Sequence, residues 1–227
     1  GGVLKEATVS DSKEDLGRLI TYYETQLKKN GIDVVFEEAN VDTIVKGGYD
    51  VAILATGAKV RVPEVKGLDS KEAIYAMDFL DQGAKTDAQN IVVVGGGIVG
   101  AETALILAEE QGKNVTITTR SPEFFVSGVM GIAYMTRLAM AGVKNCPKMQ
   151  LIAIEDGKPV FVGPRGIETM DVDQVIISSG FIPTFNKLRD EIEAASDEIE
   201  VVGIGDCMAP RMVMDAVHEG YIAGVNI

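Results

Sequence analysis

The chain has 227 residues, 46% of them hydrophobic and 24% charged, which is enough apolar material for one large domain or two small ones. A net charge of −13, from 34 acidic and 21 basic residues, argues against nucleic acid or an anionic membrane as a partner. No apolar run approaches the roughly 18 residues of a transmembrane helix. Cys146 and Cys207 form no C-x-x-C motif, so we expect no metal cluster or redox dithiol, and a cytoplasmic location.

The first third of the chain predicts a helix followed by two strands. Apolar residues keep helical spacing up to Asn30-Gly31, at Leu16, Leu19, Ile20, Tyr23 and Leu27. Ile32–Phe36 predicts a strand, and Tyr49–Ala58 predicts a buried strand that runs into a turn at Thr56-Gly57. Residues 59–70 are typical of a connector, and Ile74–Leu80 is expected to be helical.

The β-branched run Ile91–Val94 predicts a short buried strand ahead of a glycine-rich turn. Gly95, Gly97 and Gly100 have the G-x-G-x-x-G spacing, and a helix and a second strand at Val115–Thr118 follow. Gly95 would permit the tight turn, Gly97 would let a pyrophosphate approach the backbone, and Gly100 would let the helix pack closely. The helix N-terminus would offer free N–H groups to the phosphates. The pattern predicts a dinucleotide site, and the alternative is a glycine-rich turn in a plain βαβ unit.

The rest of the chain predicts a helix, a small antiparallel meander and a final strand and helix. Three short strands between glycine turns form the predicted meander, over Met149–Ile154, Val160–Val162 and Ile167–Val172. Another strand ends at Ser179-Gly180, and Ile199–Ile204 runs into Gly205-Asp206. Helices are expected over Ile132–Met140, residues 185–195 and Met212–Gly224.

Two similar segments flank the glycine-rich unit. Asp50 and Asp173 each precede a buried strand, two small residues and a glycine. We interpret them as two crossings of the chain between domains, so that residues 63–179 are inserted into an outer domain of residues 1–62 and 180–227. The alternative is that the two strand ends are unrelated.

Together these motifs resemble the flavoprotein reductases of the pyridine nucleotide-disulfide oxidoreductase type. The resemblance rests on the paired crossover segments, the run Gly95–Glu102 and the terminal Gly205-Asp206. More narrowly, two segments resemble the carboxy-terminal half of bacterial NADH:flavin oxidoreductases related to old yellow enzyme. They are the opening from Gly1 through Tyr23 and the ending with Gly205–Cys207, Arg211, Asp215-Ala216 and Glu219–Tyr221. That group includes 2-enoate reductase, 2,4-dienoyl-CoA reductase and trimethylamine dehydrogenase, and the resemblance covers essentially the whole chain.

The resemblance implies an α/β fold in which a Rossmann-like NAD(P)-binding domain is inserted into a partial FAD-binding domain, with the small antiparallel meander added. It implies that a hydride passes from NAD(P)H to FAD, and that electrons pass onward to FMN and a 4Fe-4S cluster on an N-terminal barrel that reduces an enoate-like substrate. The chain starts Gly1-Gly2, and it contains neither that barrel nor the first FAD glycine fingerprint. We therefore expect a fragment that is inactive alone, with the missing barrel as its partner.

For FAD, the resemblance leaves Thr56-Gly57 and Gly205-Asp206 as candidate contacts. The aspartate matching Asp206 contacts the sugar-alcohol chain of the flavin in the family, whereas the alternative is an aspartate that caps a turn before a helix. We expect this chain to bind FAD weakly or not at all.

The candidate contacts to NAD or NADP lie in the glycine turn and at the ends of neighbouring strands. They are Gly95, Gly96, Gly97, Ile98, Val99, Gly100, Glu102, Thr119, Arg120, Ser179 and Gly180. Glu102 resembles a family residue near the nicotinamide, or it is a first-turn acid that complements the helix dipole.

Arg120 stands where a carboxylate would bind the ribose hydroxyls of NAD and where a basic residue would favour the 2′-phosphate of NADP. It resembles the first arginine of the NADPH-binding pair in thioredoxin reductases, but Ser121 replaces the second. The 2-enoate reductase likeness favours NADH instead, and a solvated surface charge is a third interpretation, so the preference stays open.

Three functions remain at this point. The first is the NAD(P)H-binding portion of a flavoprotein reductase. The second is a free-standing NAD(P)H-dependent electron-transfer reductase, and the third is a non-catalytic dinucleotide-binding module.

Overall fold

The computed structural model describes residues 2–124 and 128–227, which divide into two compact units. The first holds the described parts of residues 1–26 and 62–180, and the second holds residues 27–61 and 181–227. The chain passes between the units close to the two expected crossovers, whereas residues 1–26 group with the central unit and not with residues 27–61. The assignment of the units to NAD(P) and FAD stays a prediction.

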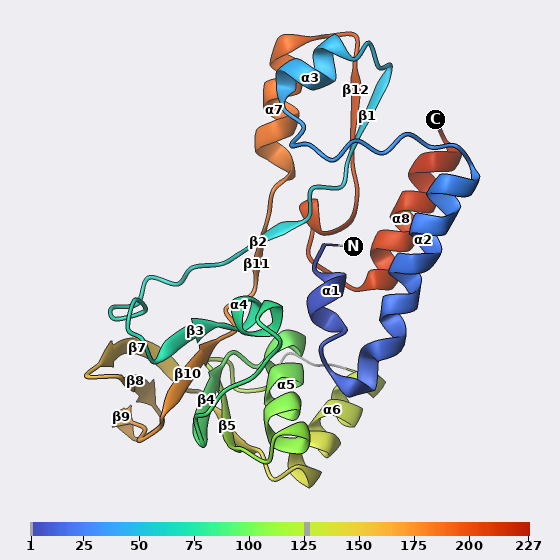
Figure 1. Ribbon diagram of the computed structural model, residues 1–227. Coiled ribbons are helices and arrows are strands. Elements are labelled where there is room, and N and C mark those ends of the chain that lie inside the picture. The colour runs from blue at the N-terminus through green and yellow to red at the C-terminus, as the bar shows by residue number, and fades with distance from the viewer. Residues whose placement is uncertain (1, 125–127) are drawn as a thin grey trace. The chain divides into compact units, whose positions relative to one another are not determined.

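A five-stranded parallel sheet forms the centre of the first unit (Figure 1). Its strands lie in the order β3 (Ala73–Tyr75), β10 (Gln174–Ile177), β4 (Asn90–Val94), β5 (Asn114–Thr119) and β6 (Lys144–Pro147). The central strands are rich in Val, Ile and Thr without polar alternation, which is the pattern of strands covered on both faces. Ile91, Val92 and Val93 are at most 1% exposed, as that pattern requires.

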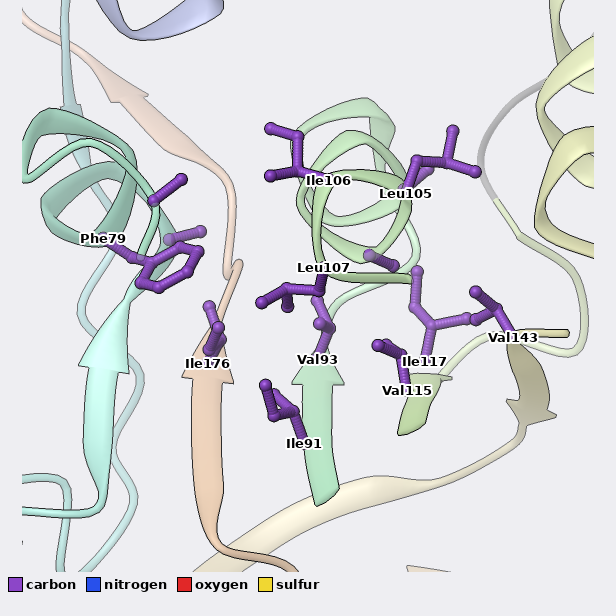
Figure 2. Packing of buried hydrophobic residues seen from close by; sticks show 14 of the residues in the cluster. Phe79, Ile91, Val93, Leu105, Ile106, Leu107, Val115, Ile117, Val143 and Ile176 are labelled. Atoms are coloured by element: carbon purple, nitrogen blue, oxygen red, sulfur yellow. The ribbon is translucent and has the colours of Figure 1, made fainter. Parts of the chain in front are cut away.

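Helices cover one face of this sheet. They are α4 (Ala76–Asp81), α5 (Ile98–Leu105) with its π-helical continuation η2 (Ile106–Glu110), and α6 (Gly128–Met140). Figure 2 shows Leu107 over Val93 and Phe79 beside Ile176. Each fully buried aliphatic side chain contributes about 1.5–3 kcal/mol of transfer free energy, so the contact of Leu107 with Val93 holds η2, the continuation of α5, on β4.

The antiparallel meander packs against the face of the parallel sheet opposite the helices. Its strands are β7 (Gln150–Glu155), β8 (Lys158–Gly163) and β9 (Gly166–Thr169), which confirms the predicted meander. Phe161 is fully buried in a cluster with Val92, Val175 and Ile177. Both faces of the parallel sheet are therefore covered.

The N-terminal segment belongs to the first unit. It forms α1 (Leu4–Ala7), the 3₁₀ helix η1 (Asp11–Leu16) and the start of α2 (Gly17–Lys29). Val9 packs against the helix-covered core, and the Ser10 hydroxyl donates a hydrogen bond to Glu110 Oε1 at 2.8 Å. These contacts fasten the segment to the end of the helix that follows the glycine turn.

The second unit contains two small strand pairs and three helices. Strand β1 (Val51–Leu54) pairs in parallel with β12 (Glu200–Gly203), and β2 (Ala58–Val60) pairs antiparallel with β11 (Phe181–Pro183). The helices are α3 (Val41–Lys46), α7 (Phe185–Ala195) and α8 (Val213–Val225), with the short 3₁₀ turn η3 (Gly205–Cys207). Its buried core consists of Leu54, Phe185, Ile192, Ile199 and Cys207.

One predicted element was wrong, and the helix predicted over Ile74–Leu80 was right except at its start. Ile32–Phe36 forms no strand, and Phe36 is 97% exposed, because no described strand pairs with this β-prone run. Ile74 lies in β3 and not in a helix, because Ala73–Tyr75 pairs with β10 and the helix begins only at Ala76.

Candidate functional site

The glycine turn joins the end of β4 to the start of α5. Gly95 has a φ of 128°, a left-handed conformation that side chains rarely adopt, and an added Cβ would clash with the Ser178 carbonyl oxygen. Its N–H donates to the Thr118 carbonyl at 2.9 Å. Only glycine fits this position without strain, so the structure supports the predicted tight turn.

Gly97 and Gly100 differ in their surroundings. Gly97 is the N-cap of α5 and has no side-chain capping bond. Among the described residues, apart from its chain neighbours and the backbone of α5, no heavy atom lies within 4 Å of the place its Cβ would take. A Cβ at Gly100 would clash with the carbonyl oxygen of Gly95. The first N–H groups of α5 therefore face an open approach at Gly97, while Gly100 provides the close packing of helix and strand.

The other predicted turn residues serve packing as well. A Cβ at Gly96 would clash with Phe124 and lie 2.9 Å from Thr119 Cβ, so a side chain already covers that glycine. Ile98 and Val99, in the first turn of α5, are half-buried. Sequence reasoning did not find Phe124, because nothing in its spacing links it to the turn.

The carboxyl ends of three strands meet beside the turn. The Ser178 N–H at the end of β10 donates to the Val94 carbonyl at 2.8 Å, and Ser179-Gly180 follow directly, with Gly180 at a φ of 85°. On the other side, β5 ends at the buried Thr119, and Arg120 is exposed. The order of strands reverses at β4 and β10, which is the place where open α/β sheets bind ligands.

Glu102 does not point into open space. Its Oε1 accepts hydrogen bonds from Lys13 Nζ of η1 and from the Tyr134 hydroxyl of α6. Burial raises the pKa of Tyr134, and the hydrogen bond and charge of Glu102 raise it further. Glu102 thus ties the N-terminal segment and α6 to α5, and its predicted place near the nicotinamide remains a proposal.

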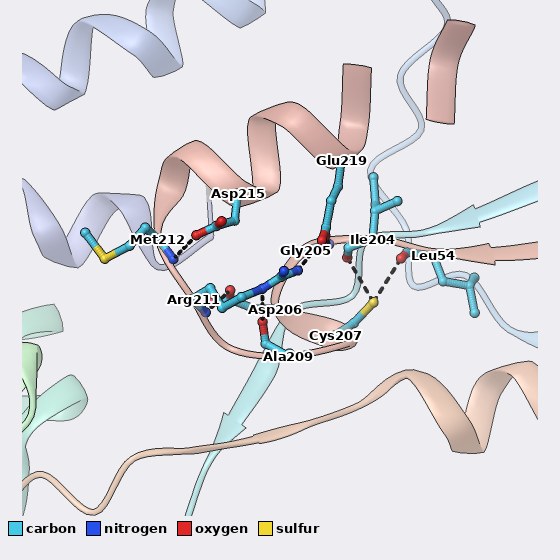
Figure 3. A network of polar contacts seen from close by, with 10 residues as sticks. All are labelled: Leu54, Ile204, Gly205, Asp206, Cys207, Ala209, Arg211, Met212, Asp215 and Glu219. Carbon is cyan, nitrogen blue, oxygen red and sulfur yellow. Dashed lines mark hydrogen bonds and ion pairs between the residues drawn. The ribbon is translucent and has the colours of Figure 1, made fainter. Parts of the chain in front are cut away.

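In the second unit, Glu219 and Arg211 organise the turn that contains Gly205-Asp206 (Figure 3). The Gly205 N–H donates to Glu219 Oε2 at 2.7 Å, and the Arg211 guanidinium pairs with Glu219 Oε1. The bond from the Gly205 N–H, and to a smaller extent the bond from Arg211, hold the pKa of Glu219 below its usual value. The backbone N–H of Arg211 donates a hydrogen bond to Asp206 Oδ1 at 3.0 Å. This is the contact expected of a turn-capping aspartate.

The first candidate FAD contact, Thr56-Gly57, lies beside Thr184. Thr56 Oγ1 lies 2.9 Å from Thr184 Oγ1, and the Thr184 hydroxyl donates to the Gly57 carbonyl at 2.7 Å. Gly57 has a φ of 69° and open space around its Cβ position. Thr184 carried no signal in the sequence, because a lone threonine before a helix is common.

The buried Cys207 thiol lies 3.0 Å from the carbonyl oxygens of both Leu54 and Ile204 (Figure 3). Both cysteines are free thiols. Within residues 2–124 and 128–227, no three His, Cys, Asp or Glu side chains gather as a metal site. None of the helices described is long and apolar enough to cross a bilayer.

Comparison with known proteins gives a consistent match. The family model of pyridine nucleotide-disulphide oxidoreductases matches residues 3–220. Cinnamate reductase of Clostridium sporogenes is 35% identical over all of this chain and 34% of its own length. A 2-naphthoyl-CoA reductase structure aligns with a TM-score of 0.85 and 29% identity, over 100% of this chain and 34% of its own. The chain spans about a third of the length of these relatives.

A shorter relative is matched over more of its length. Ferredoxin–NADP reductase of Ignicoccus hospitalis is 29% identical, over 89% of this chain and 75% of its own length.

Proposed function

Since the chain belongs to the pyridine nucleotide-disulphide oxidoreductase family, we propose that it is the NAD(P)H-binding portion of a flavoprotein oxidoreductase related to the enoate-type reductases. The observation that carries the proposal is the open N-terminus of α5 at Gly97, set at the switch point of the parallel sheet. That arrangement fits a pyrophosphate held by backbone N–H groups.

The residues of the first unit have distinct tasks in this proposal. Gly97 and the first turn of α5 bind the pyrophosphate, and Ser179-Gly180 border the site from the end of β10. Glu102, held by Lys13 and Tyr134, keeps α5 and the N-terminal segment in place.

In the second unit, Thr56-Gly57 and Asp206 would contact FAD. Asp206 Oδ1 already accepts the Arg211 N–H, which leaves Oδ2 for a sugar hydroxyl. When bound, NAD(P)H and FAD supply the hydride chemistry, and the protein positions them and excludes water. FMN and a 4Fe-4S cluster would belong to a barrel domain that precedes this portion and acts on an enoate-like substrate.

Calorimetric titration of the 227-residue chain with NADH, NADPH and FAD tests the proposal. We expect saturable binding of a nicotinamide dinucleotide and much weaker binding of FAD. The proposal fails if neither NADH nor NADPH binds while the chain shows a cooperative unfolding transition.

The second candidate is a free-standing NAD(P)H-dependent electron-transfer reductase. The match over 75% of a ferredoxin–NADP reductase favours it. It requires an FAD glycine fingerprint upstream and no barrel, so the complete reading frame of the gene distinguishes it from the first candidate. A non-catalytic module would bind the dinucleotide but would not reduce FAD when the complete protein is tested.

A further inference from the structure

The loops that follow β5 and β6 are joined by backbone hydrogen bonds. The two strands are parallel neighbours, and Thr119 and Pro147 face each other in the register. Beyond them, the Lys148 N–H donates to the Ser121 carbonyl at 3.0 Å and the Met149 N–H donates to the Thr119 carbonyl at 2.8 Å. Lys148 is therefore held next to the loop that carries Arg120.

Both cationic side chains at this edge are exposed. Within the described residues, neither Arg120 nor Lys148 forms an ion pair or a side-chain hydrogen bond, although the chain has a net charge of −13. Lys148 also has a φ of 59°, which is uncommon for a residue other than glycine and costs conformational energy. Two cations without carboxylate partners, fixed on adjoining loops, are suited to binding an anion.

The position of the pair indicates which anion. Arg120 directly follows β5, where the dinucleotide fold places the 2′ position of the adenosine ribose. A phosphate monoester carries nearly two negative charges at pH 7 and offers three acceptor oxygens. The Arg120 guanidinium and the Lys148 ammonium supply two positive charges and several N–H donors, which complement the charge and the acceptor oxygens of that phosphate.

We propose that Lys148 is a specificity-determining residue which, with Arg120, binds the 2′-phosphate of NADPH and makes this unit select NADPH over NADH. The proposal rests on the dinucleotide site proposed above. It provides the second cation that the sequence lacks at Ser121, since Lys148 reaches the same edge from the next strand.

Calorimetric titrations of the 227-residue chain with NADPH, NADH and 2′,5′-ADP test this assignment. We expect NADPH to bind more tightly than NADH. Lys148→Gln should weaken NADPH and 2′,5′-ADP binding about tenfold, as for one charge-assisted hydrogen bond, and change NADH binding by less than about twofold. Arg120→Gln should act in the same direction, and the double variant should lose the preference for NADPH.

Lys144→Gln is the matched control, because Lys144 is an exposed lysine at the opposite end of β6. It should change none of the three affinities. Equal weakening of NADH and NADPH by Lys148→Gln, or no effect on either, would overturn the assignment and leave the dinucleotide site standing. Absence of binding by all three ligands to the unaltered chain would overturn both proposals.

Discussion

Gly100 packs so closely against Gly95 that a Cβ at residue 100 would run into the Gly95 carbonyl oxygen. At Gly97, in the same turn, no heavy atom of the described chain beyond its neighbours in sequence and the α5 backbone lies within 4 Å of the Cβ position. One glycine is therefore required by the packing of α5 on β4. The other leaves space that the fold itself does not fill.

Gly97→Ala and Gly100→Ala should separate these two roles. Gly100→Ala should lower the free energy of unfolding by about 1–3 kcal/mol, the usual cost of overpacking. Gly97→Ala should leave the urea midpoint nearly unchanged and weaken dinucleotide binding about tenfold or more, because its methyl group occupies the approach of the pyrophosphate. Urea unfolding and calorimetry measure the two effects. If Gly97→Ala left the affinities for NADH and NADPH unchanged, the dinucleotide would not bind at this turn.

Glu102→Gln should lower the pKa of Tyr134. Burial is the first cause of that raised pKa and Glu102 the second, so the value should fall toward, but stay above, the ordinary tyrosine value of about 10. Absorbance titration at high pH measures it, with Tyr134→Phe identifying the signal among the other tyrosines. An identical titration curve in Glu102→Gln would mean that the hydrogen bond between them does not form in solution.

The glycine turn and its strands were predictable because their requirements are local. The motif depends only on the local geometry of a strand, a turn and a helix, and consecutive residues determine that geometry. Its glycines are Gly95, Gly97 and Gly100. The link from Lys13 to Glu102 is different, since it joins segments far apart in sequence. No spacing rule connects them, and only the tertiary fold brings η1 and α5 close enough for this contact.

The failed strand prediction has a related cause. Ile32–Phe36 has the β-branched and aromatic composition of a strand, but a strand also needs a partner with free backbone groups. Within the described residues this run pairs with no strand, so the propensity is not realised. Composition predicted β1 and β12 correctly because each finds the other in a parallel pair.

Phe161→Ala should destabilise the first unit strongly. Phe161 is fully buried between the meander and the parallel sheet, and truncation of such a side chain typically costs about 3–5 kcal/mol. Val162→Ala, on the same strand but 45% exposed, is the control and should cost far less. Urea unfolding followed by circular dichroism measures both. Equal costs for the two variants would contradict the packing of the meander on the sheet.

Asp173→Asn should reduce stability at neutral pH and much less in acid. Asp173 Oδ2 accepts the backbone N–H groups of Asn90 at 2.7 Å and Gln89 at 3.0 Å, which lower its pKa. Because the folded pKa lies below the unfolded value of about 3.9, the carboxylate stabilises the fold above that pH. This contribution to stability is lost as the pH falls through the lowered pKa that Asp173 has in the folded state.

Urea midpoints of the two proteins, measured between pH 7 and pH 3, should therefore converge as the pH falls. Asp50→Asn is the matched control, since Asp50 occupies the same place in the other crossover segment but its side chain makes no hydrogen bond within the described residues. A similar loss in both variants would assign the effect to surface charge in general.

The two thiols should differ in reactivity. Cys207 is 0% exposed, with its Sγ 3.0 Å from the Leu54 carbonyl oxygen, whereas Cys146 is half-buried at the edge strand β6. A thiol reagent such as DTNB attacks an accessible thiolate, so Cys146 should react first and Cys207 only after the second unit opens. Cys146→Ser should remove the fast phase and leave the slow one. Fast reaction of Cys207 in that variant would show that the core around β1 and η3 is open in solution.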